Sequence, residues 1–184
     1  MQSVEVNGLI FDEYLSAEKI AEIVGNVAER INNDYAGKEP LFICVLNGAF
    51  MYASDLFKCI TLPSEITFVR LKSYEGTSTT GEVKILTPLS VDIQGRDVIV
   101  IEDIIDTGNT LSYLIEHLKE KEPNSIKLCA LLDKPERRET EVFVDYVGFT
   151  IPNEFVVGYG LDADNYYRCL PYVGYFKKKT LTKK

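Results

Sequence analysis

Apolar residues along the chain follow two periods, one typical of helices and the other typical of buried strands. Within 20–31 they recur every three or four residues and so share one face of a helix. Ser16 can cap the start of this helix, and Gly37 ends it. Shorter stretches at 49–59 and 111–118 predict two further helices.

Short apolar runs alternate with these helices. The longest unbroken run, at 41–46, is far below the ~20 residues that a membrane-spanning helix needs, and it suits a strand buried on both faces of a parallel sheet. Because strands and helices alternate along the chain, the pattern predicts an α/β fold with a parallel sheet. The other expected strands lie at 66–71, 98–101, 126–132, 143–149 and 155–157.

The segment 74–83 interrupts this alternation. Between Gly76 and Gly81 it has no large apolar residue, so we expect a mobile loop between two strands, of the kind that often acts as a lid. The two glycines have P-loop spacing, but Glu82 and Val83 stand where a P-loop requires lysine and serine or threonine. A kinase or GTPase of the P-loop type is therefore excluded.

Length and charge narrow the class of protein. The chain has 184 residues, 46% of them apolar and 26% charged, which suits one globular domain rather than a disordered chain. Its net charge of -8 disfavours nucleic acid as the main partner. The lysine-rich stretch 177–184 is more typical of a solvated end than of a binding arm.

The cysteines and the single histidine exclude a zinc site. Cys44, Cys59, Cys129 and Cys169 lie far apart, and we expect them to be small buried hydrophobic residues in a reducing cytoplasm. No signal peptide or membrane segment is expected. His117 falls on the polar flank of a predicted helix, so acid–base chemistry must come from carboxylates, lysines or tyrosines.

The most informative stretch is VIVIEDIIDTGNTL at 98–111. A buried strand runs into Glu102, Asp103 and Asp106, and a turn then opens a helix, whose free amides favour a phosphate. The carboxylates suit ribose hydroxyls or a divalent cation. The alternative, in which Asp106 or Thr107 merely caps the helix, leaves the other acids beside the buried strand unexplained. The turn consists of Thr107, Gly108, Asn109 and Thr110.

This stretch resembles the phosphoribosyl pyrophosphate motif of type I phosphoribosyltransferases. Segments similar to the hypoxanthine-guanine branch follow in order from about Leu41 to Arg168. The resemblance implies the type I fold, with a twisted, mainly parallel sheet flanked by helices and a flexible lid loop. It also implies a single domain over 1–184, with a core at about 16–149 and a small hood from the N-terminus and about 150–184.

The resemblance further implies roles for individual residues. Asp106 would accept the proton of purine N7, and the turn after it would bind the 5′-phosphate. Glu102 and Asp103 would hold the ribose hydroxyls or Mg²⁺, and Asp162 would reach Mg²⁺ through water. The remaining roles fall to Lys134, Phe155, Val156 and Asp162 at the purine, Leu46, Asn47, Gly48 and Arg168 at the pyrophosphate, and Ser73 and Tyr74 at the start of the lid.

Several of these roles have plainer alternatives. Lys134 could be an exposed lysine at a strand end, Phe155 could pack in the core, and Arg168 could form a surface ion pair. Asn47 departs from the family, which often has lysine there. The resemblance implies a cis Leu46–Asn47 peptide, at least when pyrophosphate is bound.

The expected function is purine salvage. The family transfers the 5-phosphoribosyl group from phosphoribosyl pyrophosphate to N9 of hypoxanthine or guanine with Mg²⁺, giving IMP or GMP and pyrophosphate. A cytoplasmic homodimer or homotetramer is expected, with no nucleic acid or membrane partner. The alternative is a regulator that binds the phosphoribosyl ligand without turnover.

Overall fold

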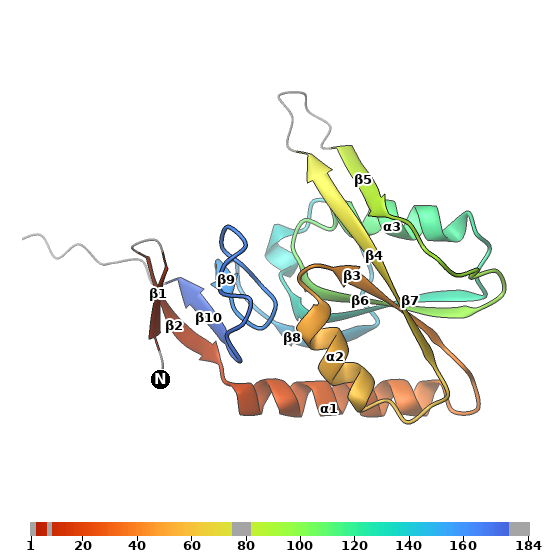
Figure 1. Cartoon of the computed structure of the whole chain (residues 1–184), viewed down its shortest axis with the longest axis horizontal. Helices are drawn as coiled ribbons and strands as arrows, with labels where there is room; N and C mark the ends of the chain where they lie inside the picture. The colour runs from red at the N-terminus through yellow and green to blue at the C-terminus, as the bar shows by residue number, and fades with distance from the viewer. Residues whose placement is uncertain (1–2, 7–8, 75–81, 177–184) are drawn as a thin grey trace, which may run out of the picture.

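The structure, a computed structural model, describes residues 3–6, 9–74 and 82–176. Its larger sheet has six strands in the order β5-β4-β3-β6-β7-β8 (Figure 1). All neighbouring strands in it are parallel except the antiparallel pair β4 and β5. The expected α/β fold with a mainly parallel sheet is therefore confirmed. The strands are β3 (Leu41–Leu46), β4 (Glu65–Tyr74), β5 (Glu82–Thr87), β6 (Asp97–Ile105), β7 (Ser125–Asp133) and β8 (Tyr146–Thr150).

Helices cover both faces of this sheet. Helices α1 (Ala17–Asp34) and α2 (Phe50–Lys58) lie on one face and α3 (Asn109–Lys119) lies on the other (Figure 1). Successive side chains of a strand point to opposite faces, and β3 supplies both cores in this way. Phe42 packs on the α1 and α2 side, whereas Ile43 packs on the α3 side. This double burial explains why β3 is apolar throughout.

Helix α1 forms as its sequence pattern predicts. Ser16 is its N-cap, and the backbone N–H of Lys19 donates to Ser16 Oγ at 3.3 Å. The buried residues of the helix run from Ile20 to Ile31 on the face turned to the sheet. The helix therefore places its apolar stripe in the core and its charged residues in solvent.

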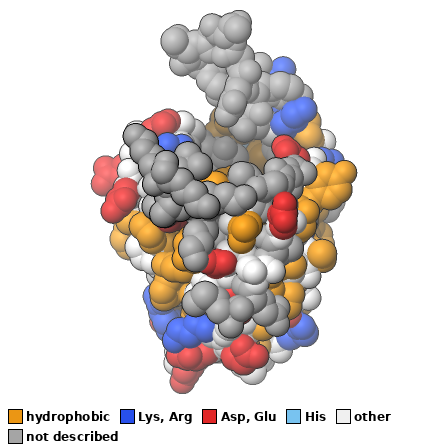
Figure 2. All heavy atoms as spheres, turned by 90° about the vertical axis from the view of Figure 1, so that its left-hand side faces the viewer, with side chains coloured by type: hydrophobic (Ala, Val, Ile, Leu, Met, Phe, Trp, Pro, Cys, Tyr) orange, Lys and Arg blue, Asp and Glu red, His pale blue; other side chains and the backbone are white. Residues whose placement is uncertain are grey.

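A second, smaller sheet has the order β1-β2-β10-β9 and forms a hood at one side of the core (Figure 1). Its core consists of Phe11 and Val157, both fully buried, and Phe11 packs on Phe155 and Phe176 at centroid distances of 6.0 and 5.8 Å. Figure 2 shows the hood side, where acidic, basic and apolar side chains are interspersed over the described surface. Its strands are β1 (Ser3–Val6), β2 (Leu9–Leu15), β9 (Val156–Val157) and β10 (Val173–Phe176).

Some sequence predictions differ from the structure. Strand β8 begins only at Tyr146, and Phe143, which we expected in it, is 80% exposed. Cys44 and Cys129 are buried as expected, but Cys59 and Cys169 are exposed, so the prediction of buried cysteines is wrong for these two.

Other differences concern elements that were not predicted or cannot be compared. Strands β1, β2, β5 and β10 were not predicted. Most of the expected lid, at 75–81, lies outside the described residues. Within the described part of the chain, no helix is long and apolar enough to cross a membrane.

Strand order determines where a ligand can bind. From β3, the chain adds β4 on one side and later returns to place β6 on the other. Crevices form outside the carboxyl ends of parallel strands at such a reversal. The residues that follow β3 and those at the end of β6 therefore meet at one edge of the sheet.

Candidate active site

A cavity of about 430 Å³ lies at this edge, beyond the carboxyl ends of β3 and β6. It brings together nine of the residues that the sequence assigned to the site, from three separate parts of the chain. The nine are Gly48, Glu102, Asp103, Asp106, Thr107, Gly108, Thr110, Asp162 and Arg168.

Two adjacent carboxylates form the floor of the cavity. Asp103 is 8% exposed, and its Oδ1 accepts the N–H of Ile104 at 2.7 Å. Glu102 Oε1 accepts the N–H of Asp103 at 3.2 Å. Burial, and then the neighbouring Asp103, raises the pKa of Glu102 well above its usual range. Burial also raises the pKa of Asp103, although hydrogen bonds to Glu102 and Ile104 and the charge of Arg168 oppose this shift.

The turn after β6 leads directly into α3. Gly108, with φ of 86°, is the N-cap of this helix, in a left-handed conformation that favours glycine. The side chain of Asn109 does not line the cavity. Its Nδ2 donates to Glu139 Oε2 at 3.0 Å, and its Oδ1 accepts the hydroxyl of Thr140. The side chain of Asn109 therefore anchors the turn to Glu139 and Thr140 and does not line the cavity.

Asp106 lines the cavity, and Lys134 lies near Asp106 without lining the cavity. The carboxylate of Asp106 is 45% exposed, and its Oδ1 accepts the Nε–H of Arg137 at 3.0 Å. Lys134 is only 6% exposed, so the alternative of an exposed strand-end lysine is wrong. Desolvation lowers the pKa of Lys134, and the charge of Asp106 partly offsets this effect. A buried lysine beside a carboxylate is typical of a functional site.

Arg168 and Asp162 come from the loop after β9. They form an ion pair at 2.8 Å, and Arg168 Nη1 donates to the carbonyl of Gly160 at 2.6 Å. Their side chains are 22% and 30% exposed and line the cavity. The ion pair expected as the plainer alternative for Arg168 is thus present, and it faces the carboxylates of β6.

The predicted purine residues of the hood differ in burial. Phe155 is 51% exposed, so it does not pack in the core, and one side of its ring contacts Phe11. Val156 is 5% exposed and pairs with β10. Neither residue lines the cavity, and nor does Lys134.

The turn after β3 has the expected backbone. The Leu46–Asn47 peptide is cis, as the resemblance implied. Asn47 is exposed at this turn, and Gly48 lines the cavity. At the other side, Ser73 and Tyr74 end β4 and pair with the first residues of β5.

No role was assigned to Arg138 or to Asp133 from the sequence. Arg138 Nη1 donates to the carbonyl of Asp106 at 2.8 Å, and Nη2 donates to Asp133 Oδ1. An arginine that acts on a backbone carbonyl 32 residues away leaves no local pattern in a sequence.

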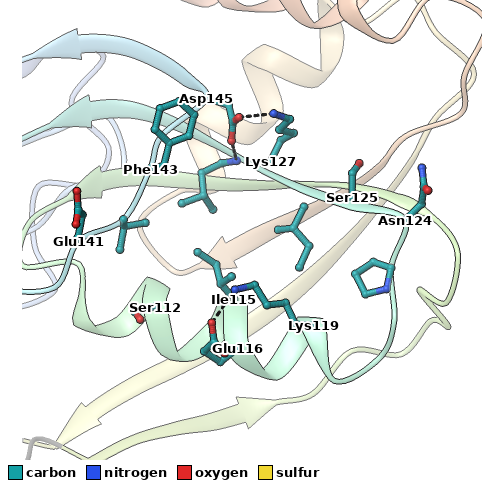
Figure 3. Close-up of a pocket in the computed structure, with 14 residues that line it drawn as sticks. Ser112, Ile115, Glu116, Lys119, Asn124, Ser125, Lys127, Glu141, Phe143 and Asp145 are labelled. Carbon is teal, nitrogen blue, oxygen red and sulfur yellow. Dashed lines mark hydrogen bonds and ion pairs between the residues drawn. The ribbon is translucent and has the colours of Figure 1, made fainter.

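A larger cavity of about 540 Å³ lies elsewhere, between α3 and β7 (Figure 3). Ser112, Ile115 and Lys119 line it from the helix and Lys127 from the strand, where Lys127 pairs with Asp145 at 2.6 Å. It contains none of the predicted site residues. We therefore assign the chemistry to the smaller cavity, where carboxylates meet a helix N-terminus.

Comparisons with known proteins identify the family to which the chain belongs. The family model described as "Phosphoribosyl transferase domain" matches residues 11–164. The hypoxanthine phosphoribosyltransferase of Salmonella typhimurium is 50% identical over 157 residues, which are 85% of this chain and 87% of that protein. The hypoxanthine-guanine phosphoribosyltransferase of Streptococcus thermophilus is 47% identical over 169 residues, 91% of this chain and 94% of the relative.

Solved structures give the same result. The crystal structure of a hypoxanthine phosphoribosyltransferase from Staphylococcus aureus has a TM-score of 0.87 and 41% identity, and the match covers 94% of each chain. The chain spans about a quarter of the length of another relative, the bifunctional protein TilS/HprT of Listeria monocytogenes, to which it is 46% identical over 164 residues. On these matches, the chain belongs to the hypoxanthine-guanine phosphoribosyltransferase family, as its sequence motifs predicted.

Proposed function

We propose that this chain transfers the 5-phosphoribosyl group of phosphoribosyl pyrophosphate to N9 of hypoxanthine or guanine. The bond between C1′ and the pyrophosphate oxygen breaks, the N9–C1′ bond forms, and the purine loses its N7 proton. The products are IMP or GMP and pyrophosphate. The observation that carries this proposal is the single cavity in which Glu102 and Asp103 face the N-terminus of α3.

The cavity supplies a complementary group for each part of the phosphoribosyl substrate. The backbone amides and hydroxyls of 107–110 suit the 5′-phosphate, because a helix N-terminus favours an anion. Glu102 and Asp103 can accept hydrogen bonds from the ribose hydroxyls. Arg168 and Gly48 line the cavity, and together with Leu46 and Asn47 they are proposed to bind the pyrophosphate.

Asp106 is proposed as the general base. Its carboxylate is partly exposed at the rim, where the N7 proton of a bound purine could reach it. Lys134 would donate to the 6-oxo group, and its charge disfavours the 6-amino group of adenine. Phe155 offers an exposed ring face for stacking, with Val156 and Asp162 at the edge of the base.

The carboxylates also fit Mg²⁺. Among the described residues, no group of three or more metal-binding side chains is present. Mg²⁺ is commonly held by one or two carboxylates together with substrate oxygens and water, so Glu102 and Asp103 suffice, with Asp162 acting through water. When bound, the ion would neutralise charge on the pyrophosphate. The raised pKa values of both acids fit a site that awaits a cation.

The domain layout and the oligomeric state are proposed from the same family membership. We propose one domain over 1–184, with its core at about 16–149 and its hood from the N-terminus and about 150–184. A cytoplasmic homodimer or homotetramer, without nucleic acid or membrane partners, completes the proposal.

The decisive experiment measures pyrophosphate release from phosphoribosyl pyrophosphate with each purine in turn. We expect turnover with hypoxanthine or guanine, none with adenine, and loss of activity in excess chelator. Robust turnover with adenine, or full activity without divalent cations, would refute the proposal. Binding of phosphoribosyl pyrophosphate without any turnover would favour the regulator instead.

A further inference from the structure

The segment that follows Lys134 binds the carbonyl groups of the turn after β6. Arg138 Nη1 donates to the carbonyl of Asp106 at 2.8 Å. The N–H groups of Glu139 and Thr140 donate to the carbonyl of Thr107 at 2.9 and 3.0 Å. Two successive carbonyls of the turn therefore point away from the cavity, toward 138–140.

These bonds also determine where the amides of the turn point. In a trans peptide, the C=O and the N–H of the next residue point in opposite directions. With the carbonyls of Asp106 and Thr107 turned toward 138–140, the N–H groups of Thr107 and Gly108 are turned away from 138–140, and both residues line the cavity. No acceptor in the described parts of the chain takes either N–H, so both remain available for a ligand.

Arg138 is held firmly in this position. Its second amino group donates to Asp133 Oδ1, and the two side chains are only 15% and 14% exposed. A planar guanidinium can bind both acceptors at fixed angles, whereas a lysine ammonium is a single point of charge on a flexible stem. The Asp133 carboxylate thus fixes the guanidinium, and the guanidinium fixes the Asp106–Thr107 peptide.

Packing at Gly108 shows how closely the two segments fit. A Cβ at Gly108 would come closer than 3.0 Å to the carbonyl oxygen of Thr140 and would lie 3.1 Å from Cδ of Arg138. The turn therefore has little room to rotate while 138–140 remains in place. Without the bond from Arg138, the carbonyl of Asp106 would lose its side-chain donor, and the Asp106–Thr107 peptide could rotate more freely.

We propose that Arg138 is a positioning residue for recognition of the 5′-phosphate. By holding the carbonyl of Asp106, it presents the amides of the turn to the phosphate. This inference rests on the proposed function for its substrate, because it assumes a phosphorylated ribose in the cavity.

The test uses Arg138→Lys and Arg138→Gln in the full chain. We expect the KM for phosphoribosyl pyrophosphate and the Kd for IMP to rise about tenfold or more, since misaligned donors bind an anion poorly. The KM for hypoxanthine should change much less. Arg96→Lys is the matched control, because Arg96 also binds a carboxylate, Glu65 Oε2 at 2.8 Å, but lies at the opposite end of β6.

The KM readout separates positioning from a purely structural role. A variant that only loses stability has a smaller active fraction, which lowers the apparent kcat and leaves KM unchanged. An unchanged KM and an unchanged Kd for IMP in both Arg138 variants would overturn the inference. If neither variant folds, Asp133→Asn decides in the same way, because it loosens the guanidinium but keeps Arg138.

Calorimetric binding of ribose 5-phosphate tests the role of Arg138 independently of the proposed transferase activity. A wild-type chain that fails to make IMP but binds ribose 5-phosphate in an Arg138-dependent way would refute only the function. A chain that makes IMP with the same KM after Arg138→Lys and Arg138→Gln would refute only the inference.

Discussion

Gly48 lies so close to Asp103 that a Cβ at Gly48 would overlap the Oδ2 atom of the Asp103 carboxylate. The two residues are 55 positions apart but meet because β3 and β6 are parallel neighbours. A carboxylate that must face a ligand is thus packed directly on the backbone of the neighbouring turn. Only glycine leaves room for the carboxylate in this position.

Gly48→Ala should therefore impair the site. The new methyl group must displace the Asp103 carboxylate or the turn, and a displacement of about 1 Å in a catalytic arrangement can cost ~10²-fold in rate. We expect a loss of this size in kcat/KM and a loss of stability of about 1–3 kcal/mol. Gly25→Ala is the control, because a Cβ there meets nothing within 4 Å. Equal activity in the two variants would contradict the close approach.

Asp106→Asn tests the general base. The amide keeps the size of the side chain and can still accept from Arg137, but it cannot take the N7 proton. Because general base catalysis is worth about 10²–10⁴-fold, kcat should fall by such a factor while the Kd for phosphoribosyl pyrophosphate changes little. Asp92→Asn, at an exposed turn where Asp92 accepts the N–H of Gln94, should retain full activity. An unchanged kcat in Asp106→Asn would make Asp106 a helix-entry residue only.

Much of the fold was predictable because its signals are local. The helical stripe after Ser16, the apolar run of β3 and the acidic end of β6 each lie within one short window of sequence. The site motif at 98–111 was found for the same reason. This one stretch of sequence contains the apolar strand, the carboxylates and the start of the helix.

The features that the sequence did not reveal depend on distant partners. Strand β2 is stabilised by β10, which places Phe11 opposite Phe176, and neither segment has a strong pattern alone. Edge strand β5 begins with alternating polar and apolar residues. It was not predicted as a strand because it directly follows a glycine- and threonine-rich segment, which indicates a loop. The contact of Arg138 with the Asp106 carbonyl joins a side chain to a backbone group, and backbone groups are the same in every residue.

Lys134 provides a test of base recognition. Replacing Lys134 with glutamine removes the charge beside the 6-oxo group, and a hydrogen bond to a charged group is worth about 1.5–3 kcal/mol. The KM for hypoxanthine should therefore rise roughly 10–100-fold, with less discrimination against adenine. Lys119→Gln is a suitable control, because Lys119 is 60% exposed and pairs with Glu116 on the same helix, α3. The same KM for hypoxanthine in both variants would show that Lys134 does not contact the base.

Lys134 also predicts a pH dependence of base binding. Burial lowers its pKa below the usual value of 10.5, so the ammonium is lost at a lower pH than that of an exposed lysine. Affinity for hypoxanthine should therefore fall as pH rises through this lowered pKa. The titration of hypoxanthine itself affects wild type and Lys134→Gln equally, so it cancels in the ratio of their affinities for hypoxanthine. A ratio that stays constant up to pH 10.5 would argue against a charged Lys134 at the base.

Acid stability should depend on Asp97, at the start of β6. Its Oδ1 accepts the hydroxyl of Ser125 at 2.6 Å and the amide of Asn124 at 2.7 Å, which ties β6 to β7. The Ser125 bond lowers the pKa of Asp97 below its ordinary 3.8, with help from Asn124 and Lys38 and against the effect of burial. The unfolded chain therefore binds the proton more readily than the folded chain does.

Because the pKa of Asp97 is lower in the folded chain, its full contribution to the free energy of unfolding is present well above pH 3.8. This contribution is lost as the pH falls through the pKa of Asp97 in the folded chain. Urea unfolding at neutral pH should show Asp97→Asn to be less stable by about 1.5–3 kcal/mol, the usual contribution of a hydrogen bond to a charged group. Below about pH 5 the difference from wild type should shrink, because the wild-type carboxylate is progressively protonated. Glu22→Gln, which removes an exposed pair with Lys19, should cost at most about 1 kcal/mol. A difference between wild type and Asp97→Asn that stays constant from pH 7 to about pH 3 would mean that the two forms differ in packing rather than in the charge of Asp97.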